Sequence, residues 1–348
     1  MNLHSYDSIS KSKRQAEKLA DAYRAIAFKN HDQAREDVAD IFERKAKAVQ
    51  SCSTVWVGQE CSICGKLHTM HTWGCKDRLC PICSTRRSRV LASQSQQIIP
   101  KVISDGEGDA TLVTLTIKNI HGAELPSAIT RMLEGWAACT QSYDMRKSVD
   151  GWARSLEITY NEQTNTFHPH IHAIVLSPEE RWMDNEYWER RWKTACALDY
   201  TPVVDARQIK KGTQGHAILE VSKYITKTGA LIDRLSPGML SCVVEPLAMS
   251  IRARRLTAYG GDWAAERRKL HLKDPEAMTD IELSEADRDC SKNTIICCGT
   301  ECKLIMLDWL GMQYDKFYPA DMSNDEKTAN AIFRGKKAVD AMQNNQEE

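Results

Sequence analysis

The sequence lacks four features, and each absence limits what the protein can be. Its 348 residues carry 47 basic and 47 acidic side chains, so there is no net charge. Any nucleic-acid binding must therefore come from local basic patches. No apolar run is long enough to span a bilayer, and the N-terminal residues lack the apolar core of a signal peptide. There is also no glycine-rich phosphate-binding loop. We expect a cytoplasmic protein without a membrane partner.

Cysteine, by contrast, is abundant, with 13 in the chain. In an intracellular protein, many cysteines indicate metal ligands and free thiols rather than disulfides. Two Cys-x-x-Cys pairs are separated by fifteen residues, a spacing typical of a four-cysteine zinc site. We predict one structural Zn²⁺, with Cys75 as an alternative ligand and buried free thiols as the alternative interpretation. The predicted ligands are Cys61, Cys64, Cys80 and Cys83. No zinc pattern fits Cys290, Cys297, Cys298 and Cys302.

Two groups of arginines are candidates for DNA contacts. The first follows the second cysteine pair and opens a helix predicted to reach about Val102, and the second lies in a helix predicted over residues 245–259. Clustered guanidinium groups suit phosphate oxygens, although solvated surface explains single arginines equally well. The candidates are Arg78, Arg86, Arg87, Arg89, Arg252, Arg254 and Arg255.

Three histidines alternate along a predicted strand over residues 167–176. Alternate side chains share a strand face, so we predict that His170 and His172 bind one divalent metal. If the preceding turn is symmetric about residues 163 and 164, Glu157 lies opposite His170 and is the third ligand. The alternative is a histidine-rich edge strand. Oxygen ligands favour Mg²⁺ and imidazoles favour Mn²⁺, so the choice of metal stays open.

The predicted elements around these histidines alternate in the order β-α-β-β-α-β. This order is typical of an α+β, ferredoxin-like antiparallel sheet whose central strands are the first and the third. The two helices would cover one face and leave the histidine face open to a ligand. The strands are predicted over 111–117, 152–160, 167–176 and 201–206, the helices over 126–146 and 179–198, and two further helices over 10–50.

A short helix predicted over residues 215–229 carries three polar groups at helical spacing. Glu220 and Tyr224 are four residues apart and Lys227 is three further on, so all three share one helix face. A carboxylate, a phenol and an ammonium can supply a base, a nucleophile and a stabiliser of negative charge. This pattern is common in helices. It indicates a catalytic site only because it follows the predicted metal-binding strand.

In this order the motifs resemble those of the HUH endonucleases, and within them the rolling-circle replication initiators of small plasmids. The resemblance covers about residues 60–260 and rests on the strand at 114–119, the histidines at 168–172 and the residues 220–227. The cysteine block at 75–83 also resembles one upstream in this plasmid group. Cys61, Cys64 and the residues after about 270 are not clearly matched.

The resemblance implies a reaction with roles for named residues. The metal would polarise a phosphate of single-stranded or extruded origin DNA. Tyr224 would attack it, leaving a 5′-phosphotyrosyl link and a free 3′-hydroxyl that primes a host polymerase, with a host helicase as a further partner. Lys227 would stabilise charge, and Glu220 would activate water for the terminating cleavage. The oligomeric state stays open.

The implied organisation has four regions. These are a helical segment at 1–50, a zinc-binding and basic region at 51–105, the endonuclease domain at 106–270 and a C-terminal region of unknown role at 271–348. A single-tyrosine transposase or a mobilisation relaxase would use the same chemistry. A two-histidine iron oxygenase fits the predicted helices poorly. A zinc-knuckle nucleic-acid-binding protein without catalysis would leave the histidines and Tyr224 unexplained.

Overall fold

The computed structural model divides the chain into two compact units. The cysteine unit comprises residues 1–86, 228–244 and 276–348, and the histidine unit comprises residues 87–227 and 245–275. Among the helices of the described residues, none is both long and apolar enough to cross a membrane. The division into four functional regions stays a prediction. The residues described are 6–102, 110–177, 183–209, 214–222, 228–275, 277–278 and 296–317.

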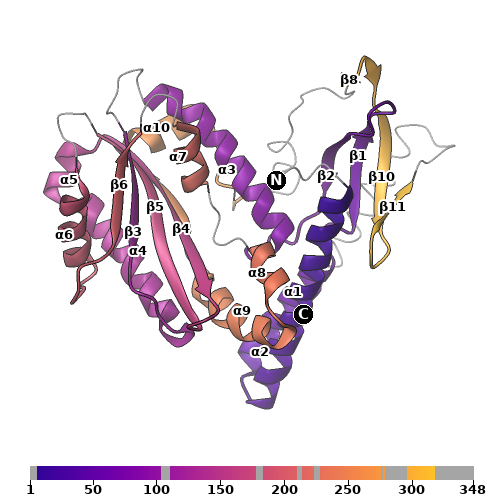
Figure 1. Ribbon diagram of the computed structural model, residues 1–348, viewed down its shortest axis with the longest axis horizontal. Coiled ribbons are helices and arrows are strands. Elements are labelled where there is room, and N and C mark those ends of the chain that lie inside the picture. Colours follow the sequence, from indigo (N-terminus) through magenta and orange to yellow (C-terminus); the bar gives the residue numbers. More distant parts are fainter. Residues whose placement is uncertain are drawn as a thin grey trace. The chain divides into compact units, whose positions relative to one another are not determined.

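A five-stranded antiparallel sheet in the order β6-β3-β5-β4-β7 forms the centre of the histidine unit (Figure 1). Its first four strands have the ferredoxin-like order, with the first and third paired at the centre, so the predicted fold class is confirmed. The strands are β3 (Ala110–Thr116), β4 (Gly151–Asn161), β5 (Thr166–Leu176), β6 (Val204–Gln208) and β7 (Thr257–Gly260).

The edge strand β7 corrects the prediction of a helix over residues 245–259. Helix α9 (Pro237–Ile251) stops earlier, and the chain then pairs with β4. The carbonyl oxygen of Leu256 accepts hydrogen bonds from the N–H of Leu156 and from the buried guanidinium of Arg154. These bonds hold the segment in an extended conformation, which a sequence pattern cannot show.

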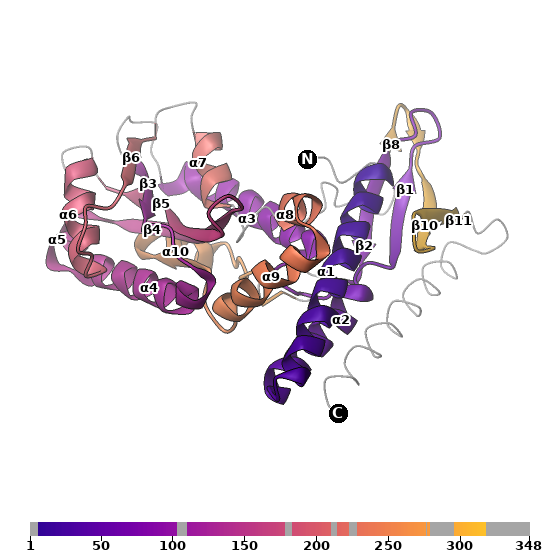
Figure 2. The ribbon, with the colours of Figure 1, turned by 60° about the horizontal axis from the view of Figure 1, so that its bottom comes forward.

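Helices α4, α5 and α6 lie on one side of this sheet and α7 on the other (Figure 2). Three buried tryptophans, Trp136 on α4 and Trp188 and Trp192 on α6, fill the first interface. The indole N–H of Trp192 donates to the carbonyl of Thr116 at 2.8 Å, which fixes α6 against β3. The elements are η1 (Gly122–Glu124), α4 (Leu125–Gln141), α5 (Tyr143–Ser148) and α6 (Asn185–Ala195).

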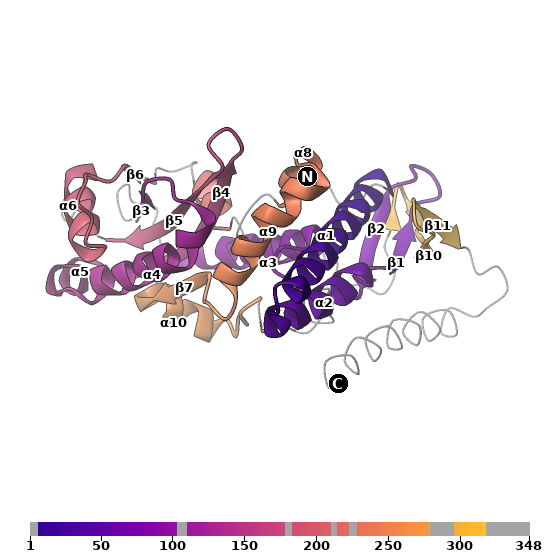
Figure 3. The ribbon, with the colours of Figure 1, turned by 90° about the horizontal axis from the view of Figure 1, so that it is seen from below.

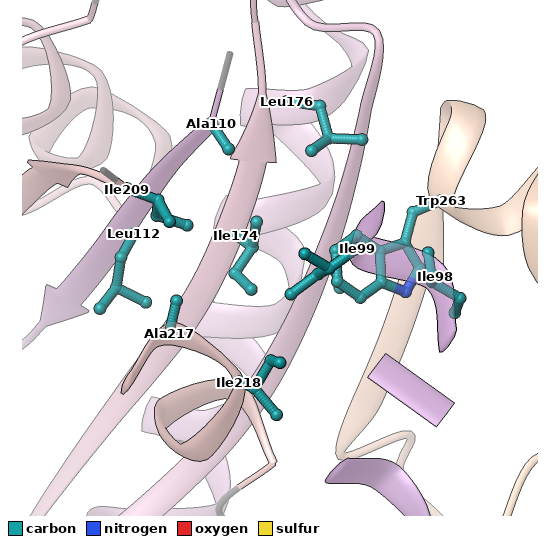
Figure 4. Close-up of a cluster of buried hydrophobic side chains, with 11 residues drawn as sticks. Ile98, Ile99, Ala110, Leu112, Ile174, Leu176, Ile209, Ala217, Ile218 and Trp263 are labelled. Atoms are coloured by element: carbon teal, nitrogen blue, oxygen red, sulfur yellow. The ribbon is translucent and has the colours of Figure 1, made fainter. Parts of the chain in front are cut away.

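The opposite face, which carries the histidines, is partly covered by helices, so it is less open than predicted. Ala217 and Ile218 of α7 (Gln214–Val221) pack on Leu112 and Ile174 (Figure 4). Helices α3 (Pro81–Val102) and α10 (Gly261–Lys269) contribute to the same apolar cluster. Along β5, Ile174 belongs to this cluster and the histidines precede it on the same face. The histidines therefore lie next to the part of this face that the apolar cluster covers.

In the cysteine unit, the two helices predicted over residues 10–50 are present and pack against each other (Figure 3). A four-stranded antiparallel sheet in the order β11-β10-β1-β2 completes this unit. Its strand β10 comes from the C-terminal region and pairs with β1, which gives that region a structural role. The elements are α1 (Tyr6–Asp32), α2 (Glu36–Gln50), β1 (Val55–Glu60), β2 (Leu67–Thr72), α8 (Thr228–Arg234), β8 (Ile296–Cys297), β9 (Thr300–Glu301), β10 (Lys303–Trp309) and β11 (Tyr314–Phe317).

Candidate active site

The structure brings together the two histidines and the glutamate predicted as metal ligands. Glu157 on β4 pairs directly with His170 on β5, which is the register that a symmetric turn predicts. Oε2 of Glu157 lies 2.9 Å from Nε2 of His170 and 2.9 Å from Nε2 of His172. The three residues are 6%, 9% and 5% exposed, respectively. The cluster is therefore screened from bulk water.

The Nδ1 atoms of both histidines have neighbours that fix the orientation of the rings. Nδ1 of His170 lies 3.1 Å from the carbonyl oxygen of His168, which can only accept a hydrogen bond, so Nδ1 carries the proton. Nδ1 of His172 lies 3.2 Å from Oγ1 of Thr114 and 3.6 Å from Oε2 of Glu220, which favours the same tautomer. Metal-binding histidines are commonly oriented by such hydrogen bonds.

With those protons on Nδ1, both Nε2 atoms direct lone pairs at the carboxylate oxygen. Three acceptors then converge, an arrangement that requires either two extra protons or a cation among them. Ligand atoms about 2.1 Å from one ion and at right angles are about 3.0 Å apart, close to the separations between Glu157 and the two imidazoles. The donor set fits a divalent cation with coordination positions left for a substrate oxygen.

A buried hydroxyl beside this cluster has no hydrogen-bond partner among the described residues. Ser155 lies opposite His172 and on the face that carries Glu157. It is 1% exposed, and its Oγ is unpaired in the part of the chain that is described. Because buried polar groups are nearly always hydrogen-bonded, this hydroxyl is placed to bond a group that the site binds. The sequence interpretation missed Ser155, although its cross-strand position follows from the same register.

Helix α7 positions Glu220 beside the histidines. Ala217, which packs on the sheet, precedes Glu220 by three residues, so both lie on one side of the helix. This places the Glu220 carboxylate 3.6 Å from His172. The predicted nucleophile Tyr224 and the predicted charge stabiliser Lys227 lie outside the described residues. Their roles stay proposals.

The predicted DNA-contacting arginines differ in exposure. Arg86 and Arg87 are each 3% exposed, and Arg86 donates to the carbonyl of Thr72, so neither presents its guanidinium to solvent. Arg254 is half-buried and donates to the carbonyl of Pro126 at 2.8 Å. Exposed or half-exposed guanidinium groups remain at Arg78, Arg89, Arg252 and Arg255.

Eight of the cysteines that the structure describes form two clusters of four instead of the predicted one. Cys80 and Cys83 lie with Cys75 and with Cys52, which had no predicted role. Cys61 and Cys64 lie with Cys297 and Cys298. In each group the four sulfur atoms are all within 4.8 Å of one another. The predicted ligand set of Cys61, Cys64, Cys80 and Cys83 is therefore wrong as a single site.

The β1–β2 hairpin explains this division. Cys52 precedes β1 and Cys75 follows β2, so both lie at the open end of the hairpin, whereas Cys61 and Cys64 form its turn. A six-residue strand is roughly 20 Å long, which is too far for the two pairs to share an ion. The spacing along the chain identified the two Cys-x-x-Cys pairs, but it could not show that each pair binds together with other cysteines rather than with the other pair.

Sulfur separations in the first cluster fit a tetrahedral zinc site. They are 3.6 Å for Cys52–Cys83, 3.7 Å for Cys75–Cys83 and 3.6 Å for Cys52–Cys80. Four sulfurs at about 2.3 Å from Zn²⁺ are about 3.8 Å apart, whereas a disulfide needs about 2.0 Å. Lys13 is fully buried nearby and donates to the carbonyl of Cys52 at 2.8 Å, placing a positive charge beside the thiolates.

The second cluster combines two turns. Residues 61–65 form a tight knuckle in which the N–H of Gly65 donates to the carbonyl of Cys61. The backbone N–H groups of Cys64 and Ile63 hydrogen-bond to the sulfur of Cys61 and lower its pKa to about 6, which favours the thiolate. Sulfur separations are 3.7 Å for Cys64–Cys297 and 3.9 Å for Cys297–Cys298.

Comparison with known proteins identifies relatives. The model of a family described as replication protein matches residues 66–303. A protein named "Protein rep" from Streptococcus pneumoniae is 31% identical over 243 residues, which cover 67% of this chain and 74% of that protein. Another "Protein rep", from Bacillus amyloliquefaciens, is 30% identical over 298 residues, or 79% and 85% of the two chains. A "Replication protein" from Staphylococcus aureus is 29% identical over 53% of this chain and 83% of its own length. No solved structure gave a significant match.

Proposed function

Since the chain belongs to the replication protein family, in agreement with its sequence motifs, we propose that it starts rolling-circle replication of a plasmid by nicking one strand of the origin. The observation that carries this proposal is the convergence of Glu157, His170 and His172 on one face of the sheet, with Nε2–Oε2 separations of 2.9 Å. In the part of the chain that the structure describes, no other cluster joins histidine and carboxylate ligands in this way.

The metal site binds and activates the DNA phosphate. His170 and His172 would hold Mg²⁺ or Mn²⁺ through Nε2, while Thr114 and the His168 carbonyl keep the rings in orientation. The ion would supply Lewis-acid polarisation of the scissile phosphate. Glu157 adds a negative charge, which raises affinity for a divalent cation over a monovalent one. The two imidazoles favour Mn²⁺ more than an all-oxygen site would.

Tyr224 supplies the nucleophile. Its phenolic oxygen attacks phosphorus as the bond from phosphorus to the 3′-oxygen breaks, the phenolic proton is lost, and the 3′-oxygen leaves as a hydroxyl. The product is a 5′-phosphotyrosyl link, and the free 3′-hydroxyl primes a host polymerase. Glu220, four residues before Tyr224 in the sequence, lies 3.6 Å from His172. Lys227 stabilises charge on the phosphoryl oxygens.

Zinc contributes to the same function by stabilising the fold, and the surface arginines contribute by binding DNA. The cluster of Cys52, Cys75, Cys80 and Cys83 holds a structural Zn²⁺ at the start of α3. Arg78, Arg89, Arg252 and Arg255 contact DNA phosphates, and their contribution falls with rising salt. Origin DNA is the partner that this family membership implies, and a host helicase and polymerase act after the nick.

A labelled single-stranded origin oligonucleotide tests the function directly. Incubated with protein and Mn²⁺ or Mg²⁺, it should give a protein–DNA adduct that survives a denaturing gel and maps to Tyr224 by mass spectrometry. Chelation by EDTA should abolish the adduct, and Mn²⁺ should restore it at lower concentration than Mg²⁺. Metal-dependent DNA binding that never yields a covalent species would instead support a binding protein without catalysis.

Glu220 is proposed to activate the water that hydrolyses the second junction and ends replication. We expect Glu220→Gln to form the first adduct at near wild-type rate, because glutamine keeps the size of the side chain and Thr114 still lies 3.2 Å from Nδ1 of His172. The hydrolytic release of DNA should fall on the order of 10²-fold, since an amide is not a base. The rates of adduct formation and adduct decay, measured separately on the oligonucleotide, check this.

Glu220→Ala serves as the comparison because it removes both the base and the side chain that lies 3.6 Å from Nδ1 of His172. If Glu220 acts only by orienting His172, Glu220→Gln should behave as wild type in both steps, and Glu220→Ala should slow adduct formation. Clean release of DNA by both variants would contradict the base role.

A further inference from the structure

We propose that Cys61, Cys64, Cys297 and Cys298 bind a second structural Zn²⁺, separate from the ion expected at Cys52, Cys75, Cys80 and Cys83. The four sulfurs lie within 4.8 Å of one another. Two separations, 3.7 Å and 3.9 Å, bracket the roughly 3.8 Å expected for sulfurs around a tetrahedral Zn²⁺. They are far longer than a disulfide bond.

The first half of this site has the backbone of a metal knuckle. Gly65 has a φ of +66°, and nothing lies within 4 Å of the position that a Cβ would take, so the turn requires glycine for its conformation. The N–H of Gly65 donates to the carbonyl of Cys61 at 2.9 Å, which closes the turn and holds Cys61 and Cys64 close together. Cys61 and Cys64 lie outside the segment that the family model matches, residues 66–303.

The second half is a two-residue turn between β8 and β9. Cys298 and Gly299 have φ values of +52° and +78°, the conformation of a type I′ turn. Asparagine, aspartate or glycine normally occupies the first of these positions, because other side chains are strained there. Cysteine brings no local advantage to the turn, so its presence points to a role for the sulfur.

The site lies where three strands end. Cys61 follows β1, Cys64 precedes β2, and the β8–β9 hairpin leads directly into β10, whose Lys303 pairs with Glu60. Cys64 and Cys297 are separated by 233 residues in sequence, and the whole histidine unit lies between them. Zn²⁺ at this position would join the two distant parts of the chain that build the sheet of the cysteine unit, and it would offset the entropy of closing that long loop.

Zinc stoichiometry of the full-length protein tests this inference, measured by native mass spectrometry and by elemental analysis under reducing conditions. The measurement uses a His172→Ala background, so that the histidine site does not add zinc. We expect two zinc ions per chain, and only one in the double variant that combines Cys64→Ser with Cys298→Ser. The matched control is Cys302→Ser: Cys302 is buried beside Cys61 but outside the group of four, so two ions should remain.

Cobalt substitution adds a readout of the ligands. With two Co²⁺ ions bound, the thiolate-to-metal absorption should be about twice that of Cys64→Ser/Cys298→Ser, in which one tetrahedral four-thiolate site is left. Circular dichroism checks that the variant is folded. Retention of two zinc ions by the double variant, a single zinc ion in the parent protein, or a mass lower by two hydrogens from a Cys64–Cys297 disulfide would each overturn the proposal.

Discussion

Replacing His172 with alanine is expected to abolish metal-dependent nicking, with a loss on the order of 10³-fold or more. The variant removes one Nε2 ligand and leaves Glu157, which is 6% exposed, with one imidazole neighbour instead of two at 2.9 Å. The remaining pair can no longer surround an ion, so polarisation of the phosphate is lost. The rate of adduct formation on the labelled oligonucleotide, at saturating Mn²⁺, is the measurement.

A second readout separates loss of metal from loss of fold. Titration with Mn²⁺, followed by electron paramagnetic resonance of the free ion, should show one strong site fewer per chain in His172→Ala. Thermal melting followed by circular dichroism should show that the variant remains folded, because His172 lies at the edge of the apolar cluster and not within it.

The matched control is His168→Ala, on the same strand face four residues before His172. Its backbone carbonyl still accepts from Nδ1 of His170, and its side chain is outside the group of potential ligands. Adduct formation should therefore stay within a few-fold of wild type. An equal loss in both variants would mean that the strand tolerates no substitution, and full activity of His172→Ala would contradict the metal site.

The histidine site could be predicted because it depends on local rules. Strand alternation put His170 and His172 on one face, and the symmetry of a short turn put Glu157 opposite His170, as the register shows. The fold class followed from element order for the same reason. Sequence periodicity could not show that α7 docks through Ala217 and Ile218, which brings Glu220 to 3.6 Å from His172.

The cysteine sites show where such rules stop. Chain spacing identifies a knuckle such as Cys61–Cys64, but its partner Cys297–Cys298 lies 233 residues away, and only the pairing of β10 with β1 brings them together. Cys52 belongs to no Cys-x-x-Cys pair, and its place at the open end of the β1–β2 hairpin makes it a candidate ligand. Which cysteines share a site is decided by contacts between residues distant in sequence, and the periodicity of the sequence does not predict those contacts.

Tyr224→Phe is expected to remove the covalent protein–DNA adduct completely, and nicking should fall on the order of 10⁴-fold or more. Phenylalanine keeps the aromatic ring but has no oxygen to bond phosphorus. DNA binding should change little, because the metal ligands and arginines are intact. A denaturing gel of the labelled adduct and a filter-binding assay of affinity give the two readouts.

Tyr160→Phe is the matched control, since it removes a hydroxyl from the same unit. Tyr160 lies on β4, three residues from Glu157, and its hydroxyl donates to Oδ1 of Asn165 at 2.8 Å. It should form adduct at the wild-type rate. Adduct retained in Tyr224→Phe would assign the nucleophile to another side chain. Nicking retained without any adduct would instead mean that metal-activated water attacks the phosphate, and the mechanism would then be hydrolysis and not strand transfer.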